Sequence, residues 1–341
     1  MPSVDVRSNI ADLYAQARSG ERRSLGRLLS LVERGGPGAD ELSGLIHGDS
    51  GSAHIIGITG SPGSGKSTLV GQLVRDLVVA GKSPAVLAVD PSSPLTGGAI
   101  LGDRVRIDAD TRDSPAIAGS SPLPFIRSMA TRGHSGGLAL AVPLAVRLFD
   151  AVGYDPVIIE TVGVGQVEVD VVGAADTAVV VMTPGMGDSV QANKAGLLEV
   201  ADLFVVNKAD RPGADDVRRD LDLMLDLSHL TGQESDTGYR PPIIMASALH
   251  GDGTADIWAA AVDHLAHLDT SGLRQSRRSH RLRTEIRARV EHRLAMAANA
   301  LIDSPAGLDI LAQTERSDLA PNDASVNLLD LLLKQPEEPP S

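Results

Sequence analysis

The spacing of apolar residues predicts helices at the start of this 341-residue chain. Apolar side chains recur with the i, i+3, i+4, i+7 spacing of an amphipathic helix at Leu25, Leu28, Leu29 and Val32. The stretch 35–38, three glycines and a proline, interrupts this pattern. We therefore expect residues 1–50 to form a segment of amphipathic helices.

From about residue 54 to residue 266 the pattern changes to short apolar runs rich in β-branched residues, separated by helical stretches. These runs are 54–59, 85–89, 157–159, 177–182, 203–206 and 243–246. Strands that alternate with helices in this way are typical of an α/β fold with a mostly parallel sheet and helices on both faces. Only three Phe, three Tyr and one Trp are present, so we expect a core of Val, Leu, Ile and Ala.

After Leu268 the composition becomes basic, with eight arginines and two glutamates between residues 274 and 293. Apolar side chains keep a helical spacing through this stretch, at Leu282, Ile286, Val290, Leu294 and Leu301. The pattern predicts a long helix with a basic face, which is interpreted as a solvated surface, a dimer interface or a partner surface. We expect a last short helix over 324–334 and a disordered, proline-rich end after it.

The overall charge and the lack of cysteine exclude several classes of function. A formal charge of −13 argues against nucleic acid and anionic membranes as partners. No cysteine is present, which excludes disulfides, thiolate metal sites and cysteine nucleophiles. Residues 1–10 carry Asp5 and Arg7 and lack the apolar centre of a signal peptide, and no run of 18 apolar residues occurs. We therefore expect a cytoplasmic protein.

The clearest chemical motif is the phosphate-binding loop GxxxxGK[ST], which follows the apolar run 55–58 and precedes a helical pattern. It consists of Gly60, Ser61, Pro62, Gly63, Ser64, Gly65, Lys66 and Ser67, with Thr68 directly after it. The glycines allow backbone N–H groups to surround phosphate oxygens at the start of a helix. We expect Lys66 to bind the β and γ phosphates and Ser67 to ligate Mg²⁺.

Two acidic residues follow predicted strands, where a Mg²⁺ site needs a carboxylate: Asp90 after 85–89 and Glu160 after 157–159. Gly163 lies three positions after Glu160, and this spacing suits a switch loop whose backbone contacts the γ phosphate. Each acid taken alone would more often be a helix cap or a surface charge. Because both follow a phosphate-binding loop in order, we predict that Asp90 and Glu160 serve Mg²⁺ and catalysis.

The run 203–206 ends in an NKxD motif, made of Asn207, Lys208, Ala209 and Asp210. An aspartate carboxylate accepts hydrogen bonds from guanine N1–H and from the 2-amino group, whereas adenine would leave the carboxylate unpaired. After the run 243–246, the backbone of Ser247, Ala248 and Leu249 is expected to contact the guanine carbonyl oxygen. The sequence therefore predicts a nucleotidase that binds GTP rather than ATP.

Three longer segments resemble the MeaB/ArgK family, the GTPases associated with methylmalonyl-CoA mutase, and the resemblance covers roughly residues 5–335. The segments are VDPSSPLTGGAILGDR at 89–104, IRSMATRG at 126–133 and ETVGVGQ at 160–166. The resemblance implies an N-terminal helical segment over 1–50, a SIMIBI-type P-loop GTPase domain over 51–268, a C-terminal helical dimerisation arm over 269–335 and a disordered tail over 336–341. It also implies a homodimer, and it adds Asp103 to Lys66, Ser67, Asp90 and Glu160 around Mg²⁺ and the phosphates.

The resemblance further implies a partner, an adenosylcobalamin-dependent acyl-CoA mutase whose cofactor loading and protection the GTPase controls as a chaperone. The segment 185–194 resembles a switch that relays the nucleotide state to the mutase, with Gln191 and Lys194 retained. The chain departs from the family pattern at Ser135, Val167, Asn193 and Ala195. These departures bear on coupling to the partner and leave the nucleotide motifs intact.

Hydrolysis is expected to be slow without a partner, because the sequence offers no identifiable arginine finger. Gln166 is interpreted either as a water-positioning residue or as an ordinary backbone contact. Two interpretations are open for Arg104, Arg127 and Arg132: each arginine binds a phosphate, or it forms an ion pair with an acidic side chain. The ion pair is the favoured interpretation.

Two alternative functions are metal insertion, which nickel chaperones of the same fold class perform, and a protein kinase of transport systems, an older interpretation of the MeaB/ArgK family. A metal-insertion GTPase would need soft or imidazole ligands, and the chain has no cysteine and nine scattered histidines. A protein kinase of transport systems would need a phosphoacceptor pocket or a catalytic-loop motif, and the sequence shows neither.

Overall fold

The computed structural model describes residues 6–90, 123–130, 135–161, 173–185, 200–230 and 238–334. The chain divides into two compact units, Met1–Arg281 and Leu282–Ser341. The division falls inside one long helix, α11 (Leu273–Ile302).

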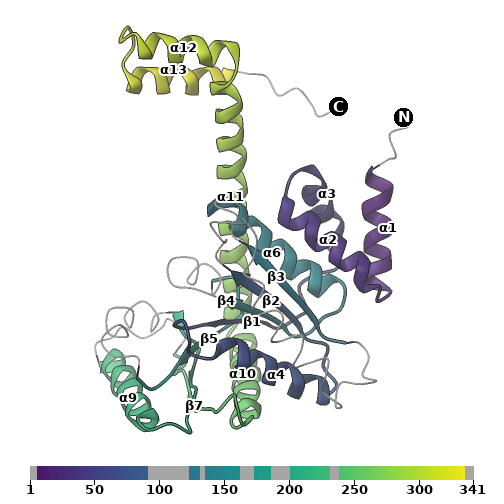
Figure 1. Ribbon diagram of the computed structural model, residues 1–341, viewed down its shortest axis with the longest axis vertical. Helices are drawn as coiled ribbons and strands as arrows, with labels where there is room; N and C mark the ends of the chain where they lie inside the picture. Colours follow the sequence, from purple (N-terminus) through teal and green to yellow (C-terminus); the bar gives the residue numbers. More distant parts are fainter. Residues whose placement is uncertain are drawn as a thin grey trace. The chain divides into compact units, whose positions relative to one another are not determined.

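The first unit is built around a seven-stranded sheet whose strands all run parallel (Figure 1). In chain order the strands are β1 (Ile55–Thr59), β2 (Ala85–Asp90), β3 (Phe125–Ala130), β4 (Val157–Thr161), β5 (Thr177–Met182), β6 (Leu203–Val206) and β7 (Ile243–Met245). Their order across the sheet is β3-β2-β4-β1-β5-β6-β7. All six predicted strands are present, and the predicted parallel α/β architecture is confirmed.

Strand β3 was not predicted, and it forms one edge of the sheet beside β2. Its sequence carries Arg127 and Ser128 in the middle, which breaks the continuous apolar run expected of a strand in a parallel sheet. An edge position tolerates such polar residues, because a helix or a loop covers only part of the strand. Arg127 forms an ion pair with Glu33 at 2.9 Å, so the favoured interpretation of this arginine is confirmed.

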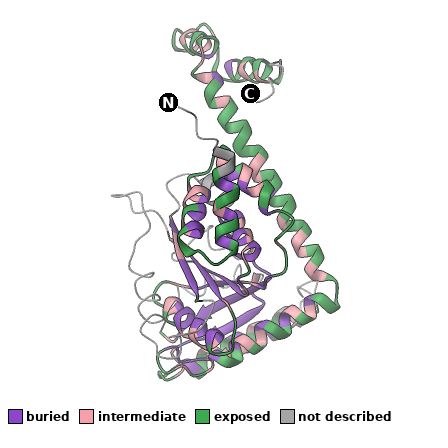
Figure 2. Cartoon of the chain, turned by 90° about the vertical axis from the view of Figure 1, so that its right-hand side faces the viewer, coloured by how far each residue is buried: buried purple, intermediate pink, exposed green. Residues whose placement is uncertain are grey.

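Alternate side chains along each strand pack against different helices, as the pleat of a strand requires. On one face, Val86 and Ile158 pack with residues of α4 (Lys66–Val79) and α10 (Thr254–Thr270). On the other face, Leu87 and Ile159 pack with residues of α6 (Ser135–Ala151), and Val180 and Val206 pack with residues of α9 (Ala214–Leu230). Figure 2 shows the strands almost wholly buried between these layers.

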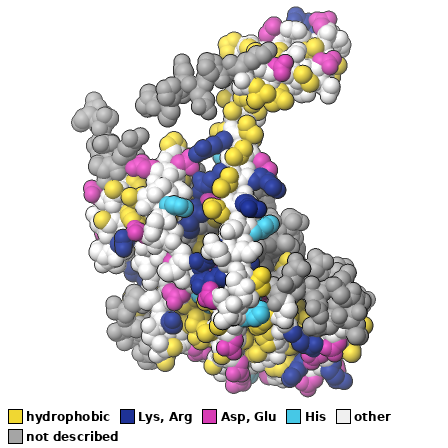
Figure 3. Space-filling model, turned by 180° about the vertical axis from the view of Figure 1, so that it is seen from behind, with side chains coloured by type: hydrophobic (Ala, Val, Ile, Leu, Met, Phe, Trp, Pro, Cys, Tyr) yellow, Lys and Arg dark blue, Asp and Glu magenta, His cyan; other side chains and the backbone are white. Residues whose placement is uncertain are grey.

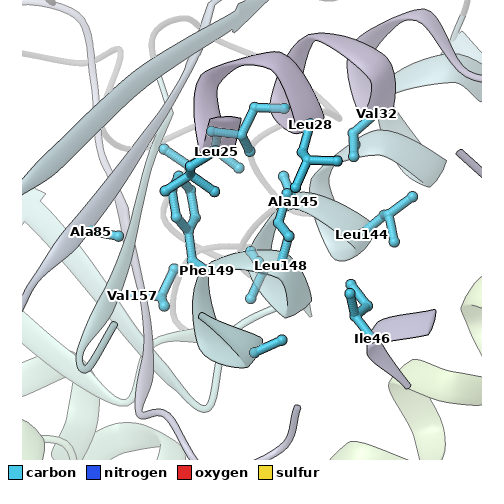
Figure 4. Close-up of a cluster of buried hydrophobic side chains, with 14 of the residues drawn as sticks. Leu25, Leu28, Val32, Ile46, Ala85, Leu144, Ala145, Leu148, Phe149 and Val157 are labelled. Atoms are coloured by element: carbon cyan, nitrogen blue, oxygen red, sulfur yellow. The ribbon is translucent and has the colours of Figure 1, made fainter. Parts of the chain in front are cut away.

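The predicted N-terminal helices are α1 (Val6–Arg18), α2 (Arg22–Arg34) and α3 (Pro37–Ile46). The apolar side chains that defined the helical pattern are buried, and Figure 4 shows Leu25, Leu28 and Val32 directed at Ala145 and Phe149 of α6. The N-terminal segment therefore extends the core of the sheet domain outward from α6, where it stabilises the layer behind β2 and β4.

The basic face of α11 begins with arginines that bind aspartates at the N-terminal ends of two strands. Arg277 Nη2 lies 2.8 Å from Asp202 Oδ1, just before β6. Arg281 Nη2 lies 2.5 Å from Asp176 Oδ1, just before β5, and Asp176 is fully buried. Burial alone would raise the pKa of Asp176, but the guanidinium groups of Arg281 and Arg278 outweigh burial and hold the pKa below its usual range.

These ion pairs correct the interpretation of the basic face. Arg277, Arg278 and Arg281 are not part of a freely solvated face, because they reach acids of the same chain. Arg277, Arg278 and Arg281 together hold the first turns of α11 against the sheet. The aspartates could not be matched to these arginines from the sequence, since each pair is separated by 75 residues or more.

The second unit contains the rest of α11 and two short helices, α12 (Pro305–Glu315) and α13 (Pro321–Lys334). The long helix and α13 were predicted, whereas α12 was not. Leu282, Ile286, Val290 and Leu294 are 48–52% exposed, and Figure 3 shows hydrophobic side chains at this surface. None of the described helices is long and apolar enough by itself to cross a membrane, and only the bent pair α11 and α12 reaches the length and composition required.

Candidate functional site

The phosphate-binding loop connects β1 to α4, as the motif predicts. Gly60 has φ +143°, and a Cβ atom there would lie 2.2 Å from the Val181 carbonyl oxygen. Gly65 has φ +88°, and a Cβ atom there would lie 2.5 Å from Asn207 Nδ2. Glycine is therefore required at both positions, because the loop passes close to β5 and to the NKxD segment.

Lys66 is buried at the first turn of α4 and directs its ammonium group back over the loop. Lys66 Nζ donates hydrogen bonds to the Gly60 carbonyl at 2.5 Å and to the Ser61 carbonyl at 3.2 Å. The positive charge thus lies over the loop whose backbone N–H groups and helix start attract an anion. Pro62, Ser64 and Thr68 belong to the same loop and the first turn that follows it.

Ser67, in the first turn of α4, meets Glu160 of the strand β4, which lies beside β1. Ser67 Oγ donates a hydrogen bond to Glu160 Oε1 at 2.6 Å, and Glu160 is fully buried. The strand registers place Glu160 beside Ile58 of β1 and Ala88 of β2, so its carboxylate lies next to the phosphate-binding loop. A hydroxyl and a carboxylate are hard oxygen donors of the kind that Mg²⁺ prefers.

The structure describes the other predicted metal ligands only in part. Asp90 ends β2 at the same edge of the sheet, but its side chain lies outside the described residues, as does Asp103. Within the described ranges, no group of three or more His, Cys, Asp or Glu side chains could hold a metal ion. A Mg²⁺ ion at Ser67 and Glu160 would therefore take further oxygens from phosphates and water, as this ion commonly does.

Asn207 and Lys208 of the NKxD motif hold the phosphate-binding loop. Asn207 is buried and donates from Nδ2 to the Ser64 carbonyl at 2.8 Å, while its Oδ1 accepts from Ala248 N–H at 3.1 Å. Lys208, with φ +60°, donates from Nζ to the Gly63 carbonyl at 2.7 Å. These two residues therefore join the loop to the predicted base-binding segments, a role that the motif alone did not reveal.

Asp210 follows on the exposed side of the same turn. Ser247 Oγ donates a hydrogen bond to Asp210 Oδ1 at 2.7 Å. This hydrogen bond holds the pKa of the Asp210 carboxyl below its usual range, so the group is an acceptor at neutral pH. Leu249 is 81% exposed at the tip of the neighbouring loop. Asp210 and Leu249 are thus both exposed, and the buried Ser247 connects the segment after β7 to Asp210.

Sequence reasoning missed His250, whose Nδ1 lies 2.8 Å from Ser247 Oγ. No signal in the sequence pointed to it, since histidine has no fixed role at this distance from an NKxD motif.

The predicted switch and catalytic residues Gly163, Gln166, Gln191 and Lys194 lie outside the described residues. The same holds for Arg104, Arg132, Val167, Asn193 and Ala195. Ser135 begins α6, but its side chain is also outside the described part. The described part of the candidate site therefore comprises the phosphate-binding loop, Glu160 and the segments predicted to bind the base.

Known proteins resemble this chain over most of its length. A relative from Pyrococcus abyssi (strain GE5 / Orsay), which carries the provisional name of a GTPase, is 42% identical over 326 residues, 96% of each chain. A fused isobutyryl-CoA mutase of Geobacillus kaustophilus (strain HTA426) is 32% identical over 273 residues, 77% of this chain and 24% of that protein. The crystal structure of a LAO/AO transport system kinase has a TM-score of 0.67 and 27% identity and covers 98% of this chain and 100% of that one.

The family model described as methylmalonyl Co-A mutase-associated GTPase MeaB matches residues 25–302, well over half of the chain. The match includes the phosphate-binding loop, Glu160 and the NKxD segment, which the fold brings to one edge of the sheet. It confirms the P-loop GTPase fold and an enzyme that binds GTP and hydrolyses it to GDP and phosphate. From its motifs, its fold and this match, the chain belongs to the MeaB family of methylmalonyl-CoA mutase-associated GTPases.

Proposed function

We propose that this GTPase depends on Mg²⁺ held by Ser67 and Glu160 and reads guanine through Asp210. The proposal rests on the 2.6 Å hydrogen bond between Ser67 Oγ and Glu160 Oε1. Ser67 directly follows Lys66, the lysine proposed to bind the phosphates. A bound Mg²⁺ would neutralise charge that develops on the phosphate oxygens during hydrolysis. Asp90 and Asp103 complete the proposed metal set.

The residues of the chain have distinct tasks in this proposal. The backbone of 60–68 encloses the phosphates, and the Lys66 ammonium leaves the Gly60 carbonyl to bind the β and γ phosphates. Asp210 accepts hydrogen bonds from guanine N1–H and the 2-amino group. Ser247, Ala248 and Leu249 present their backbone to the guanine carbonyl oxygen. Gln166, Gly163, Gln191 and Lys194 are proposed as catalytic and switch residues.

The dependence on Mg²⁺ is tested by titrating the metal against GTP turnover in Ser67→Ala and Glu160→Gln. We expect each change to raise the Mg²⁺ concentration at half-maximal rate by about 10- to 100-fold, the usual effect of losing a group that supports a metal. Glu291→Gln is the matched control, because Glu291 is exposed on α11. Unchanged metal dependence in both variants would refute the proposed site.

We further propose that the partner is an adenosylcobalamin-dependent acyl-CoA mutase, whose cofactor loading the GTPase controls as a chaperone. The relative from Geobacillus kaustophilus supports this link, since it is a fused isobutyryl-CoA mutase with a region similar to 77% of this chain. Stimulation of GTP hydrolysis by a partner also agrees with the chemistry of phosphoryl transfer. The rate of that reaction depends on positioning and charge neutralisation, which a partner can supply. A cytoplasmic location is part of this proposal.

The partnership is tested by measuring GTP turnover with and without a purified acyl-CoA mutase from the same source. We expect faster turnover in the mixture and a complex whose stability differs between GDP and a non-hydrolysable GTP analogue. If the mutase neither binds nor changes the rate, the chaperone function is excluded.

We also propose a homodimer formed by the C-terminal arm. The half-exposed Leu282, Ile286, Val290 and Leu294 form one face of a helix, and a second copy of that face would remove them from water. Light scattering at micromolar concentration should give twice the chain mass. Ile286→Glu together with Val290→Glu should give the mass of one chain, and a wild-type monomer would refute the dimer.

A protein kinase of transport systems is the second candidate, because the solved relative carries that name. Transfer of the labelled γ phosphate from GTP to a transport protein would favour the kinase. Release of the label only as inorganic phosphate would favour the GTPase. Metal insertion has less support, since the chain has no cysteine and nine scattered histidines as soft or imidazole ligands.

A further inference from the structure

A short chain of hydrogen bonds stands behind the carboxylate of Asp210. Ser247 Oγ lies 2.7 Å from Asp210 Oδ1 and 2.8 Å from His250 Nδ1. Ser247 is buried, whereas Asp210 and His250 are exposed. The serine hydroxyl therefore connects the two exposed side chains.

The direction of each hydrogen bond follows from the chemistry of the three groups. An ionised carboxylate only accepts, so the single Ser247 proton is donated to Asp210. The serine oxygen then accepts from His250, whose Nδ1 must carry a proton. His250 therefore favours the rotation in which the Ser247 proton points at Asp210, because a protonated Nδ1 cannot accept that proton and instead donates to the serine oxygen.

The loop that carries Ser247 and His250 is held independently of the histidine ring. Ser247 N–H donates to the Asp252 carbonyl at 3.0 Å, and Gly251 N–H donates to the Ser247 carbonyl at 2.9 Å. Thr254, at the start of α10, donates to Asp76 Oδ2 of α4 at 2.5 Å. Removal of the His250 ring thus leaves the backbone of the loop in place and changes the hydroxyl alone.

Asp210 retains enough acceptor capacity for a base while it is bound to Ser247. The two carboxylate oxygens offer about four lone-pair sites, of which Ser247 occupies one and guanine N1–H and the 2-amino group would occupy two. With Oδ1 held by Ser247, the plane of the carboxylate is restricted before a nucleotide arrives. Such preorganisation favours the ligand that uses both oxygens.

We propose that His250 is a positioning residue for guanine selectivity: it orients the Ser247 hydroxyl, which in turn holds the Asp210 carboxylate for the 2-amino group of guanine. The inference deepens the proposed function and rests on the role of Asp210 in it. His250 does not contact the nucleotide and takes no part in the chemical step.

The test compares GTP with inosine triphosphate, which differs from GTP only by the missing 2-amino group. In wild type, the KM for inosine triphosphate should be higher by about tenfold, the loss of one hydrogen bond to a charged group. His250→Ala should leave kcat unchanged and reduce this preference for GTP by about threefold. His280→Ala is the matched control, because His280 is an exposed histidine on α11, 30 positions further along the chain.

Two further variants separate orientation from general damage. His250→Asn carries an amide donor in place of Nδ1 and should restore the wild-type preference. In a Ser247→Ala background, His250→Ala should have no further effect, because the histidine acts only through the serine.

The outcomes distinguish this inference from the role of Asp210. Suppose that wild type prefers GTP and His250→Ala keeps that preference, or raises KM equally for both nucleotides. Either result overturns the role of His250 and leaves the role of Asp210 standing. If wild type does not prefer GTP over inosine triphosphate, the proposed role of Asp210 fails, and the inference fails with it.

Discussion

The side-chain amide of Asn207 donates a hydrogen bond to the backbone carbonyl of Ser64, 143 residues earlier in the chain. The first residue of the NKxD motif thus fastens the phosphate-binding loop. The same side chain accepts from Ala248 N–H, so one buried amide connects the loop to the segment that follows β7. The phosphate-binding loop and the segments proposed to bind the base are therefore a single hydrogen-bonded unit.

We expect Asn207→Ala to lower the free energy of unfolding by about 2 to 4 kcal/mol, because the change leaves two buried backbone groups without a partner. Binding of GTP and inosine triphosphate should weaken equally, since the phosphate-binding loop is affected and not the reading of the base. Urea denaturation and nucleotide titration measure the two effects. A variant of wild-type stability that loses only its preference for guanine would contradict this account.

Arg277 and Asp202 form the best-defined ion pair between α11 and the sheet, with two hydrogen bonds at 2.9 and 2.8 Å. Arg277→Ala would leave the nearly buried Asp202 carboxylate with fewer partners, and we expect a loss of about 2 to 3 kcal/mol in the free energy of unfolding. Arg283→Ala, an exposed arginine on the same helix, should change it by less than about 0.5 kcal/mol. Equal effects of the two changes in urea denaturation would refute the role of this ion pair.

Burial lowers the pKa of His54 to about 4. The unfolded chain therefore binds a proton at this residue at a higher pH than the folded chain, near 6.5. The stabilising contribution is complete above pH 6.5 and is lost as the pH falls toward 4.

The expected loss from His54 between pH 7.5 and pH 5 is about 2 kcal/mol in the free energy of unfolding. His54→Gln, whose amide can still form a hydrogen bond with the Thr177 hydroxyl, should remove this part of the pH dependence. Urea denaturation at both pH values measures it, with the exposed His280→Gln as control. An unchanged pH dependence in His54→Gln would show that the ring is not held neutral.

Local patterns in the sequence were sufficient to predict six of the seven strands of the central sheet and the motifs at their ends. The central strands β4, β5 and β6 are buried along their whole length, which makes their apolar runs continuous and easy to find. The phosphate-binding loop and the NKxD segment meet because parallel strands bring their C-terminal ends to one edge.

What could not be predicted depends on contacts between distant residues. Strand β3 is an edge strand whose Arg127 pairs with Glu33, so its pattern is not that of a buried strand. The pairing of Arg281 with Asp176 joins positions 105 residues apart, and no local rule relates them. The tasks of Asn207 and Lys208 likewise follow from the path of the phosphate-binding loop and not from their own neighbours in sequence.

The central claim is that one edge of the sheet binds a guanine nucleotide whose base is read by Asp210. The most direct measurement is a calorimetric titration of wild type and Asp210→Asn with the triphosphates of guanosine and xanthosine in the presence of Mg²⁺. Xanthine carries a carbonyl where guanine carries the 2-amino group, so an amide at position 210 suits xanthine and a carboxylate suits guanine. We predict that wild type binds the guanosine nucleotide more tightly and that Asp210→Asn reverses the order, by about tenfold or more in each case. The same preference in both proteins, or no heat with the guanosine nucleotide in wild type, would contradict the account.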